Sequence, residues 1–169
     1  MPKLATAYVR IIDRVNRFIG HIMMYVLFVM IAVLLWSSLS KVIFVVPASW
    51  TLEMAQFALV AYYLVGGPYS IQLGSNVRMD LFYSTWSARK KAQVDSLTVL
   101  LLIFYLGVLL YGGIDSTLYS IEYGERSPSL WRPQMWPVKV VMCFGIFMML
   151  LQAISELIKD ITRLREGDI

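Results

Sequence analysis

Four long apolar runs, divided from one another by charged segments, constrain this chain more than any other feature of its sequence. A helix that crosses the apolar part of a bilayer needs about 20 mostly apolar residues. Three runs meet this requirement directly. The last one meets it once residues 135–139 are included, because a lysine side chain can reach toward the headgroups. The runs contain no Asp, Glu, Lys or Arg, and they lie at 22–40, 54–77, 96–114 and 140–155.

The runs predict an all-α integral membrane protein with four transmembrane helices. A water-soluble four-helix bundle is excluded, because its helices would carry polar faces at helical spacing. Composition agrees, since 59% of the residues are hydrophobic and only 15% are charged, against about 25% charged in soluble domains. From a length of 169 residues we expect one transmembrane domain, residues 21–169, after a short N-terminal element. The four spans are expected at about 21–46, 52–77, 94–116 and 136–158.

The first 20 residues have a different pattern, in which apolar and charged side chains occupy opposite faces of a helix. The apolar face contains Tyr8, Ile11, Ile12, Val15, Phe18 and Ile19, and the charged face contains Arg10, Asp13, Arg14 and Arg17. This pattern predicts an amphipathic helix over residues 1–20 that lies in the membrane interface on the cytoplasmic side. A cleaved signal peptide is disfavoured, because the apolar stretch that follows is longer than the usual 7 to 15 or so residues.

Positive charge predicts the orientation of the chain. Most of its 15 Lys and Arg residues lie before the first span, between the second and third spans, or after the fourth. Positive residues stay on the cytoplasmic side of a membrane. We therefore expect both termini and the 78–91 segment to be cytoplasmic. Because the basic residues lie between apolar runs, phospholipid explains the net charge of +4 better than nucleic acid does.

The segment "WRPQMWPVK", residues 131–139, combines tryptophan, proline and positive charge just before the fourth span. Tryptophan prefers the headgroup level, so Trp136 and Trp50 are predicted to be membrane-interface anchors. A second interpretation is that this outer loop docks a protein, because aromatic and arginine side chains are enriched at protein interfaces. The docking candidates are Glu125, Arg126, Trp131 and Arg132.

Residues that carry chemistry are scarce. One histidine, His21, and one cysteine, Cys143, are present, so a haem with two histidine ligands from this chain, an internal disulfide and a cysteine metal cluster are all excluded. Phosphate-binding and hydrolase motifs are absent as well. Gly66 and Gly67, just before Pro68, indicate close helix packing and a kink, with a broken-helix ion site as the alternative. We expect no enzyme activity, no metal and no cofactor.

In these features the sequence resembles the small membrane subunit of the tripartite ATP-independent periplasmic (TRAP) transporters, the DctQ type. Trp50 and Glu53 open the second span in "WTLEMAQFALVAYYLVGG", as a tryptophan and an acid do in that family. In "GSNVRMDLF", Gly74 and Asp80 are in place, and Asn76 stands where the family often has histidine. The last span, with its Ser-Pro, Trp-Pro, Gly145 and Gln152, fits the family as well.

The resemblance implies a multi-pass protein of a bacterial or archaeal inner membrane that serves sodium-coupled uptake of an organic acid. The substrate and sodium sites would lie in a large membrane subunit, and a periplasmic substrate-binding protein would dock transiently. This chain would be the fixed scaffold. Residues for subunit contact or helix packing would be Glu53, Gly66, Gly67, Gly74, Asp80 and Gly145.

Two other functions remain open. A self-contained small four-helix exporter would need a membrane-embedded acid to couple protons to its substrate, and the first span has none. A membrane anchor subunit of a redox complex would need two haem-ligating histidines, of which this chain has one.

Overall fold

The computed structural model describes residues 3–43, 49–74 and 88–166, and these are all helical apart from the loop 123–135 and short helix ends. The fold is all-α, as the sequence predicts. The helices are α1 (Lys3–Ile43), α2 (Ser49–Gln72), α4 (Ala88–Glu122) and α5 (Trp136–Glu166).

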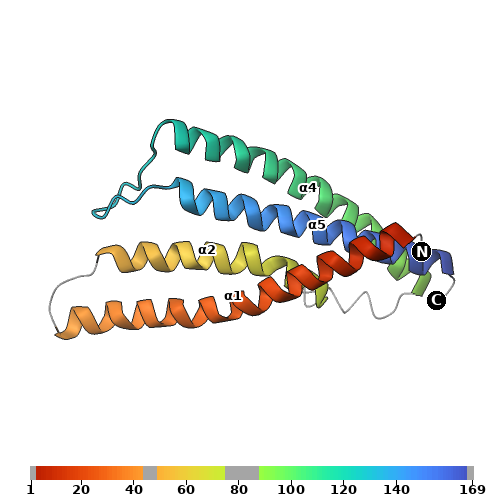
Figure 1. Ribbon diagram of the computed structural model, residues 1–169, viewed down its shortest axis with the longest axis horizontal. Helices are drawn as coiled ribbons and strands as arrows, with labels where there is room; N and C mark the ends of the chain where they lie inside the picture. Colours follow the sequence, from red (N-terminus) through yellow and green to blue (C-terminus); the bar gives the residue numbers. More distant parts are fainter. Residues whose placement is uncertain (1–2, 44–48, 75–87, 167–169) are drawn as a thin grey trace.

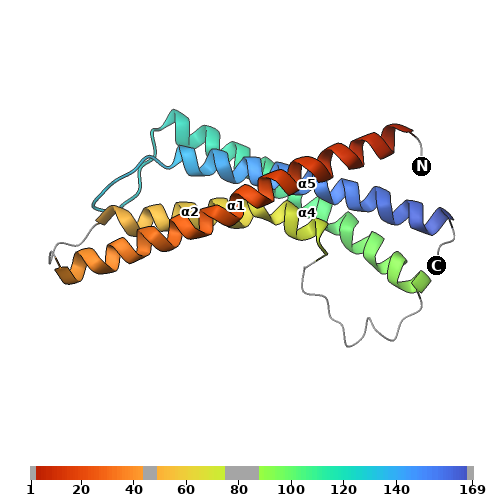
Figure 2. The ribbon, with the colours of Figure 1, turned by 60° about the horizontal axis from the view of Figure 1, so that its bottom comes forward.

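The four helices lie side by side and run alternately in opposite directions (Figure 1; Figure 2). Helix α5 packs against each of the other three, whereas α4 makes its main contacts with α5 and α1 makes most of its contacts with α2. Both termini lie at one end of the bundle. The loop 123–135, which we call the hairpin loop, lies at the other end with the end of α1 and the start of α2 (Figure 1). Charged residues far apart in the sequence therefore meet at these two ends.

Three helices in the described part of the chain are long and apolar enough to cross a membrane. These candidate spans are Ala5–Ile43, Val94–Glu122 and Trp136–Thr162. Helix α2 does not qualify, although its 24 residues suffice in length. It contains Glu53, Gln56, Pro68 and two glycines among its apolar residues. The prediction of four transmembrane helices is thus supported for three of them.

Helix α1 differs from the expectation at its N-terminal end. The sequence suggests a boundary near residue 20, between an interfacial helix and the first span, but α1 is one uninterrupted helix of 41 residues. Gly20 marks the crossing of α1 over α2 at this point. A Cβ atom on Gly20 would lie 2.4 Å from Cγ of Tyr69, so glycine is needed for close approach of the helices and does not break α1.

Two glycines end helices at opposite ends of the bundle. Gly74, with φ of +62°, follows α2, and Gly124, with φ of +61°, follows α4. In both cases the left-handed backbone favours glycine. After Gly124 the backbone N–H of Glu125 donates to the Ser120 carbonyl at 3.1 Å, which caps α4 and directs the chain into the hairpin loop.

The buried apolar core is small and lies mainly between α4 and α5. It consists of Leu106, Ile146 and Ala153, with partly buried neighbours such as Leu64 and Met149. Many large apolar side chains remain exposed instead, including Phe28 and Leu35 on α1 and Phe104 on α4. Such a surface suits lipid, which is as apolar as these side chains. Alongside this small apolar core, the helices bury polar side chains such as Asn16 and Gln152.

Candidate functional site

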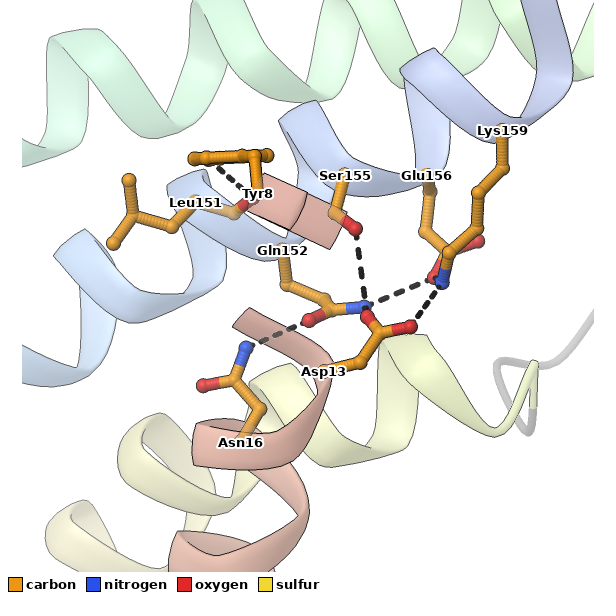
Figure 3. Close-up of polar contacts among 8 residues, drawn as sticks. All are labelled: Tyr8, Asp13, Asn16, Leu151, Gln152, Ser155, Glu156 and Lys159. Carbon is orange, nitrogen blue, oxygen red and sulfur yellow. Dashed lines mark hydrogen bonds and ion pairs between the residues drawn. The ribbon is translucent and has the colours of Figure 1, made fainter. Parts of the chain in front are cut away.

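Eight residues at the end of the bundle that holds the termini form a polar group between α1 and α5. We call this group the Asp13 cluster (Figure 3). Its residues are Tyr8, Asp13, Asn16, Leu151, Gln152, Ser155, Glu156 and Lys159.

Gln152 is the centre of this cluster. Its Oε1 accepts a hydrogen bond from Nδ2 of Asn16 at 2.7 Å. Its Nε2 donates to Oδ1 of Asp13 at 3.0 Å and to Oε1 of Glu156 at 2.9 Å. One side chain thus uses its acceptor and both of its N–H donors, and it joins α5 to residues of α1 that lie more than 130 positions away in the sequence.

Lys159 completes the cluster with charge. Its Nζ lies 2.8 Å from Oδ2 of Asp13 and 2.8 Å from Oε1 of Glu156. Two carboxylates therefore share one ammonium group, and the cluster carries a net charge of −1 when all three groups are ionised. At the edge, the Tyr8 hydroxyl donates to the Leu151 carbonyl at 3.1 Å.

Burial makes these contacts important for stability. Gln152 is 0% exposed and Asn16 is 1% exposed. Gln152 lies about 24 Å along α5 from Trp136, at 1.5 Å per residue. Gln152 therefore lies inside the candidate span Trp136–Thr162. A polar group at that depth needs a partner inside the protein, and this cluster supplies one for each polar end of Gln152.

A second polar group lies at the opposite end of the bundle, where α2 begins, and we call it the Glu53 cluster. It consists of Ser37, Thr51, Glu53 and Ser127. The Thr51 hydroxyl donates to Oγ of Ser37 at 2.9 Å, which links α2 to α1. The Ser127 hydroxyl donates to Oε1 of Glu53 at 2.6 Å, which links the hairpin loop to α2.

Backbone hydrogen bonds give the hairpin loop a defined shape. Arg126 and Gln134 form an antiparallel bridge, the N–H of Ser127 donates to the Pro133 carbonyl at 3.0 Å, and the N–H of Met135 donates to the Glu125 carbonyl at 3.0 Å. At the tip, Arg132 adopts a left-handed backbone, with φ of +50°. Such strain in a residue with a side chain is often found at functional sites.

Glu125 holds the base of the hairpin loop to α5. Its Oε2 accepts a hydrogen bond from Nζ of Lys139 at 2.5 Å, and Lys139 also donates to the Ser116 carbonyl at 3.4 Å. The hydrogen bond from Lys139 lowers the pKa of Glu125 below its ordinary value of 4.5. Glu125, a docking candidate, is thus engaged within the protein.

The other docking candidates and the predicted anchors lie on the surface. Arg126, Trp131 and Arg132 are exposed in the hairpin loop. Trp50 and Trp136 are exposed at the first turns of α2 and α5, and Nε1 of Trp136 donates to Oε1 of Gln134 at 2.8 Å.

The predicted packing residues lie in different settings. A Cβ atom on Gly145 would lie 2.6 Å from the carbonyl carbon of Leu64, and one on Gly67 would lie 3.0 Å from Sδ of Met149. Gly66 has ordinary space beside Met23, and Gly74 lies in open space after α2. Asp80 and Asn76 fall outside the described residues.

Across the described residues, no group of three or more His, Cys, Asp and Glu side chains could hold a metal ion. The two clusters can hold helices and a loop in place, and the hairpin loop can present side chains to a partner.

Sequence reasoning missed the Asp13 cluster, although a signal for it was present. Asp13 and Asn16 are three residues apart, and Gln152, Ser155, Glu156 and Lys159 recur at helical spacing. Each set therefore lies on one helical face. The missing information was that these two faces meet.

Comparison with protein families gives a match over most of the chain. The family model described as "Tripartite ATP-independent periplasmic transporters, DctQ component" matches residues 30–163. The matched range includes the Glu53 cluster and the hairpin loop, whereas Asp13 and Asn16 precede it. Comparison with curated proteins found no match.

Proposed function

Since this chain belongs to the DctQ family of TRAP transporter components, we propose that it is the scaffold subunit of a sodium-coupled transporter that takes up an organic acid. It works with a large membrane subunit of the DctM type, which carries the sodium and substrate sites. A periplasmic substrate-binding protein delivers the substrate and docks transiently.

The observation that carries the scaffold role is the position of the charges. The segments 22–40, 54–74, 96–114 and 140–155 contain no Asp, Glu, Lys, Arg or His, and the antiparallel helices bring these segments side by side (Figure 1). A transport or proton pathway through the middle of a membrane protein normally uses ionisable side chains there. The ionisable groups of the described chain gather at the two ends instead, where they fix the positions of helices and loop.

The membrane arrangement follows from the same charges. All four helices cross a bacterial or archaeal inner membrane, with α2 included because it lies between α1 and α5. The end of the bundle with both termini faces the cytoplasm, since most of the Lys and Arg residues are there. The hairpin loop then faces the periplasm.

That position makes the hairpin loop the surface that the binding protein would meet. Leu130 at its tip is 94% exposed, and Trp131, Arg132 and Arg126 lie around it. An exposed apolar tip surrounded by aromatic and basic side chains suits a transient protein contact. Glu125 supports the base of the loop through Lys139.

Reconstitution tests the scaffold role. Proteoliposomes that contain the chain alone should accumulate no organic acid when a sodium gradient is imposed, because the chain has no coupling site. Proteoliposomes with the large subunit and the binding protein should accumulate it. Sodium-driven uptake by the chain alone would refute the scaffold role.

Labelling tests the orientation separately. Cysteine is introduced in place of Leu130 at the tip of the hairpin loop, or in place of Ser87, which lies between α2 and α4 in the sequence. An impermeant thiol reagent added to intact cells, outer membrane permeabilised, should label the first variant and spare the second. The opposite result would reverse the topology.

A further inference from the structure

We propose that Glu53 is the positioning residue of the hairpin loop, which it holds over the start of α2 through Ser127. The functional consequence rests on the proposed docking role of that loop. The contact itself does not, so the two can be tested apart.

The Glu53–Ser127 hydrogen bond differs from the other contacts of the loop in what it connects. The Glu125 N–H bonds to Ser120 at the end of α4, and the Glu125 carboxylate bonds to Lys139 on α5. These contacts tie the loop to the two helices that it already joins covalently. The 2.6 Å bond between Ser127 and Glu53 spans 74 residues and reaches α2. It therefore fixes the orientation of the hairpin loop relative to α2.

Because Glu53 is buried, its carboxylate needs hydrogen-bond donors from the protein. The residue is 8% exposed, and within the described part of the chain its Oε2 is buried with no hydrogen-bond partner. A buried carboxylate with few donors is unfavourable. If the Ser127 hydroxyl moved away, Oε1 of Glu53 would lose its donor as well. The conformation in which the loop contacts Glu53 is therefore strongly favoured.

The loop needs such a contact because of its shape. Ser127 follows Arg126, whose backbone pairs with Gln134, so the bond holds one strand of the hairpin close to its base. The tip with Leu130, Trp131 and Arg132 lies beyond that bridge. Holding the base of the loop in one orientation keeps the tip in one orientation before a partner binds. Such preorganisation reduces the entropic cost of ordering the loop on binding.

Distance measurement tests the contact directly. Spin labels are placed at Leu130→Cys in the loop and Leu73→Cys at the far end of α2, in a Cys143→Ser background. The full chain is studied in lipid nanodiscs by pulsed electron resonance. Glu53, against which the loop is held, is about 30 Å along α2 from residue 73. The two labels are therefore separated by a distance that pulsed electron resonance can measure. The distance distribution should be narrow in the otherwise native chain.

Four variants separate the contact from general stability. Ser127→Ala and Glu53→Leu remove the donor or the acceptor, and each should broaden the distribution about twofold as the loop opens locally. Ser127→Thr and Glu53→Gln keep a hydroxyl or an acceptor oxygen, and each should preserve the narrow distribution. The matched control is Ser37→Ala, which removes the neighbouring hydrogen bond with Thr51 at the same end and should leave the loop in place.

A distribution that stays narrow in Ser127→Ala would overturn the proposal, as would equal broadening in Ser37→Ala. Docking is then measured in the reconstituted transporter, where Ser127→Ala should lower affinity for the binding protein about tenfold through the added ordering cost, with Ser127→Thr unaffected. Broadening without any change in affinity would keep the positioning role of Glu53 and remove the docking role of the loop.

Discussion

The Asp13 cluster and the Glu53 cluster both place carboxylates at an end of the bundle, but they satisfy them in different ways. Asp13 receives hydrogen bonds from Gln152 and Ser155 and an ion pair from Lys159. Glu53 receives one hydroxyl donor, Ser127, and leaves Oε2 without a partner in the described residues. The Asp13 carboxylate is redundantly connected, whereas the Glu53 carboxylate depends on one bond.

The elements that supply these partners differ as well. The Asp13 cluster joins α1 and α5, whose side chains are held by helical geometry along their whole length. In the Glu53 cluster, the bond from Ser127 joins α2 to the hairpin loop, whose shape depends on its own few hydrogen bonds. We infer that the Asp13 cluster determines the stability of the folded chain and that the Glu53 cluster determines the orientation of the hairpin loop.

The largest expected effect comes from the centre of the Asp13 cluster. Gln152→Ala should lower the free energy of unfolding by at least about 2 kcal/mol, because Asn16, Asp13 and Glu156 each lose a partner and buried unpaired groups cost about 1–3 kcal/mol each. The measurement is unfolding of the full chain in bicelles by steric trapping. The matched control is Gln56→Ala, an exposed glutamine on α2, which should change stability by less than about 0.5 kcal/mol. Equal effects of the two variants would contradict the importance assigned to the cluster.

A smaller effect is expected between the two clusters, where α5 crosses α2. Gly145→Ala should destabilise the chain by about 1–3 kcal/mol, because the added methyl group overlaps the backbone of Leu64 and pushes the helices apart. Gly107→Ala is the control, since a Cβ atom there meets nothing within 4 Å. It should stabilise α4 by up to about 1 kcal/mol through helix propensity. Thermal unfolding in the same bicelles would show both signs, and a neutral Gly145→Ala would indicate that the crossing can relax.

The sequence predicted the parts of this fold that depend on local pattern. The apolar runs indicated the helices, and Trp136 with Pro137 indicated the start of α5, because proline suits a first helical turn. The pattern of the first 20 residues suggested a boundary near Gly20, whereas α1 continues through this glycine as one helix. In the structure it is a contact point for Tyr69, and that contact depends on α2.

The two polar clusters could not be predicted from the sequence for a similar reason. The amphipathic pattern of residues 1–20 places Asp13 with three arginines on a polar face, but it does not say that Asp13 turns toward Gln152 while Arg14 stays exposed. The bond between Ser127 and Glu53 depends on the left-handed backbones of Gly124 and Arg132, which set the course of the loop. Both depend on contacts between segments distant in the sequence.

The smallest predicted effect is a pH response at the base of the hairpin loop. The pKa of Glu125 is lowered in the folded chain, so its contribution to stability is present above the ordinary value of 4.5 and is lost as pH falls through the folded-state value. Amide hydrogen exchange in residues 125–135 should therefore accelerate on acidification below about pH 4.5. The exchange rates are first corrected for the intrinsic pH dependence of exchange. Glu125→Gln should exchange rapidly at neutral pH and lack this response. An unchanged pH response in that variant would assign it to another group.

The proposed division of roles is tested most directly by one paired measurement on the whole transporter. Gln152→Ala and Ser127→Ala are each co-expressed with the large membrane subunit and purified, and both the yield of assembled complex and the uptake rate per complex are determined. We expect Gln152→Ala to lower the yield of complex with little change in the rate per complex. We expect Ser127→Ala to leave the yield intact and to lower the rate per complex at limiting binding protein. If both variants change the same quantity, the two ends of this molecule do not have separate roles.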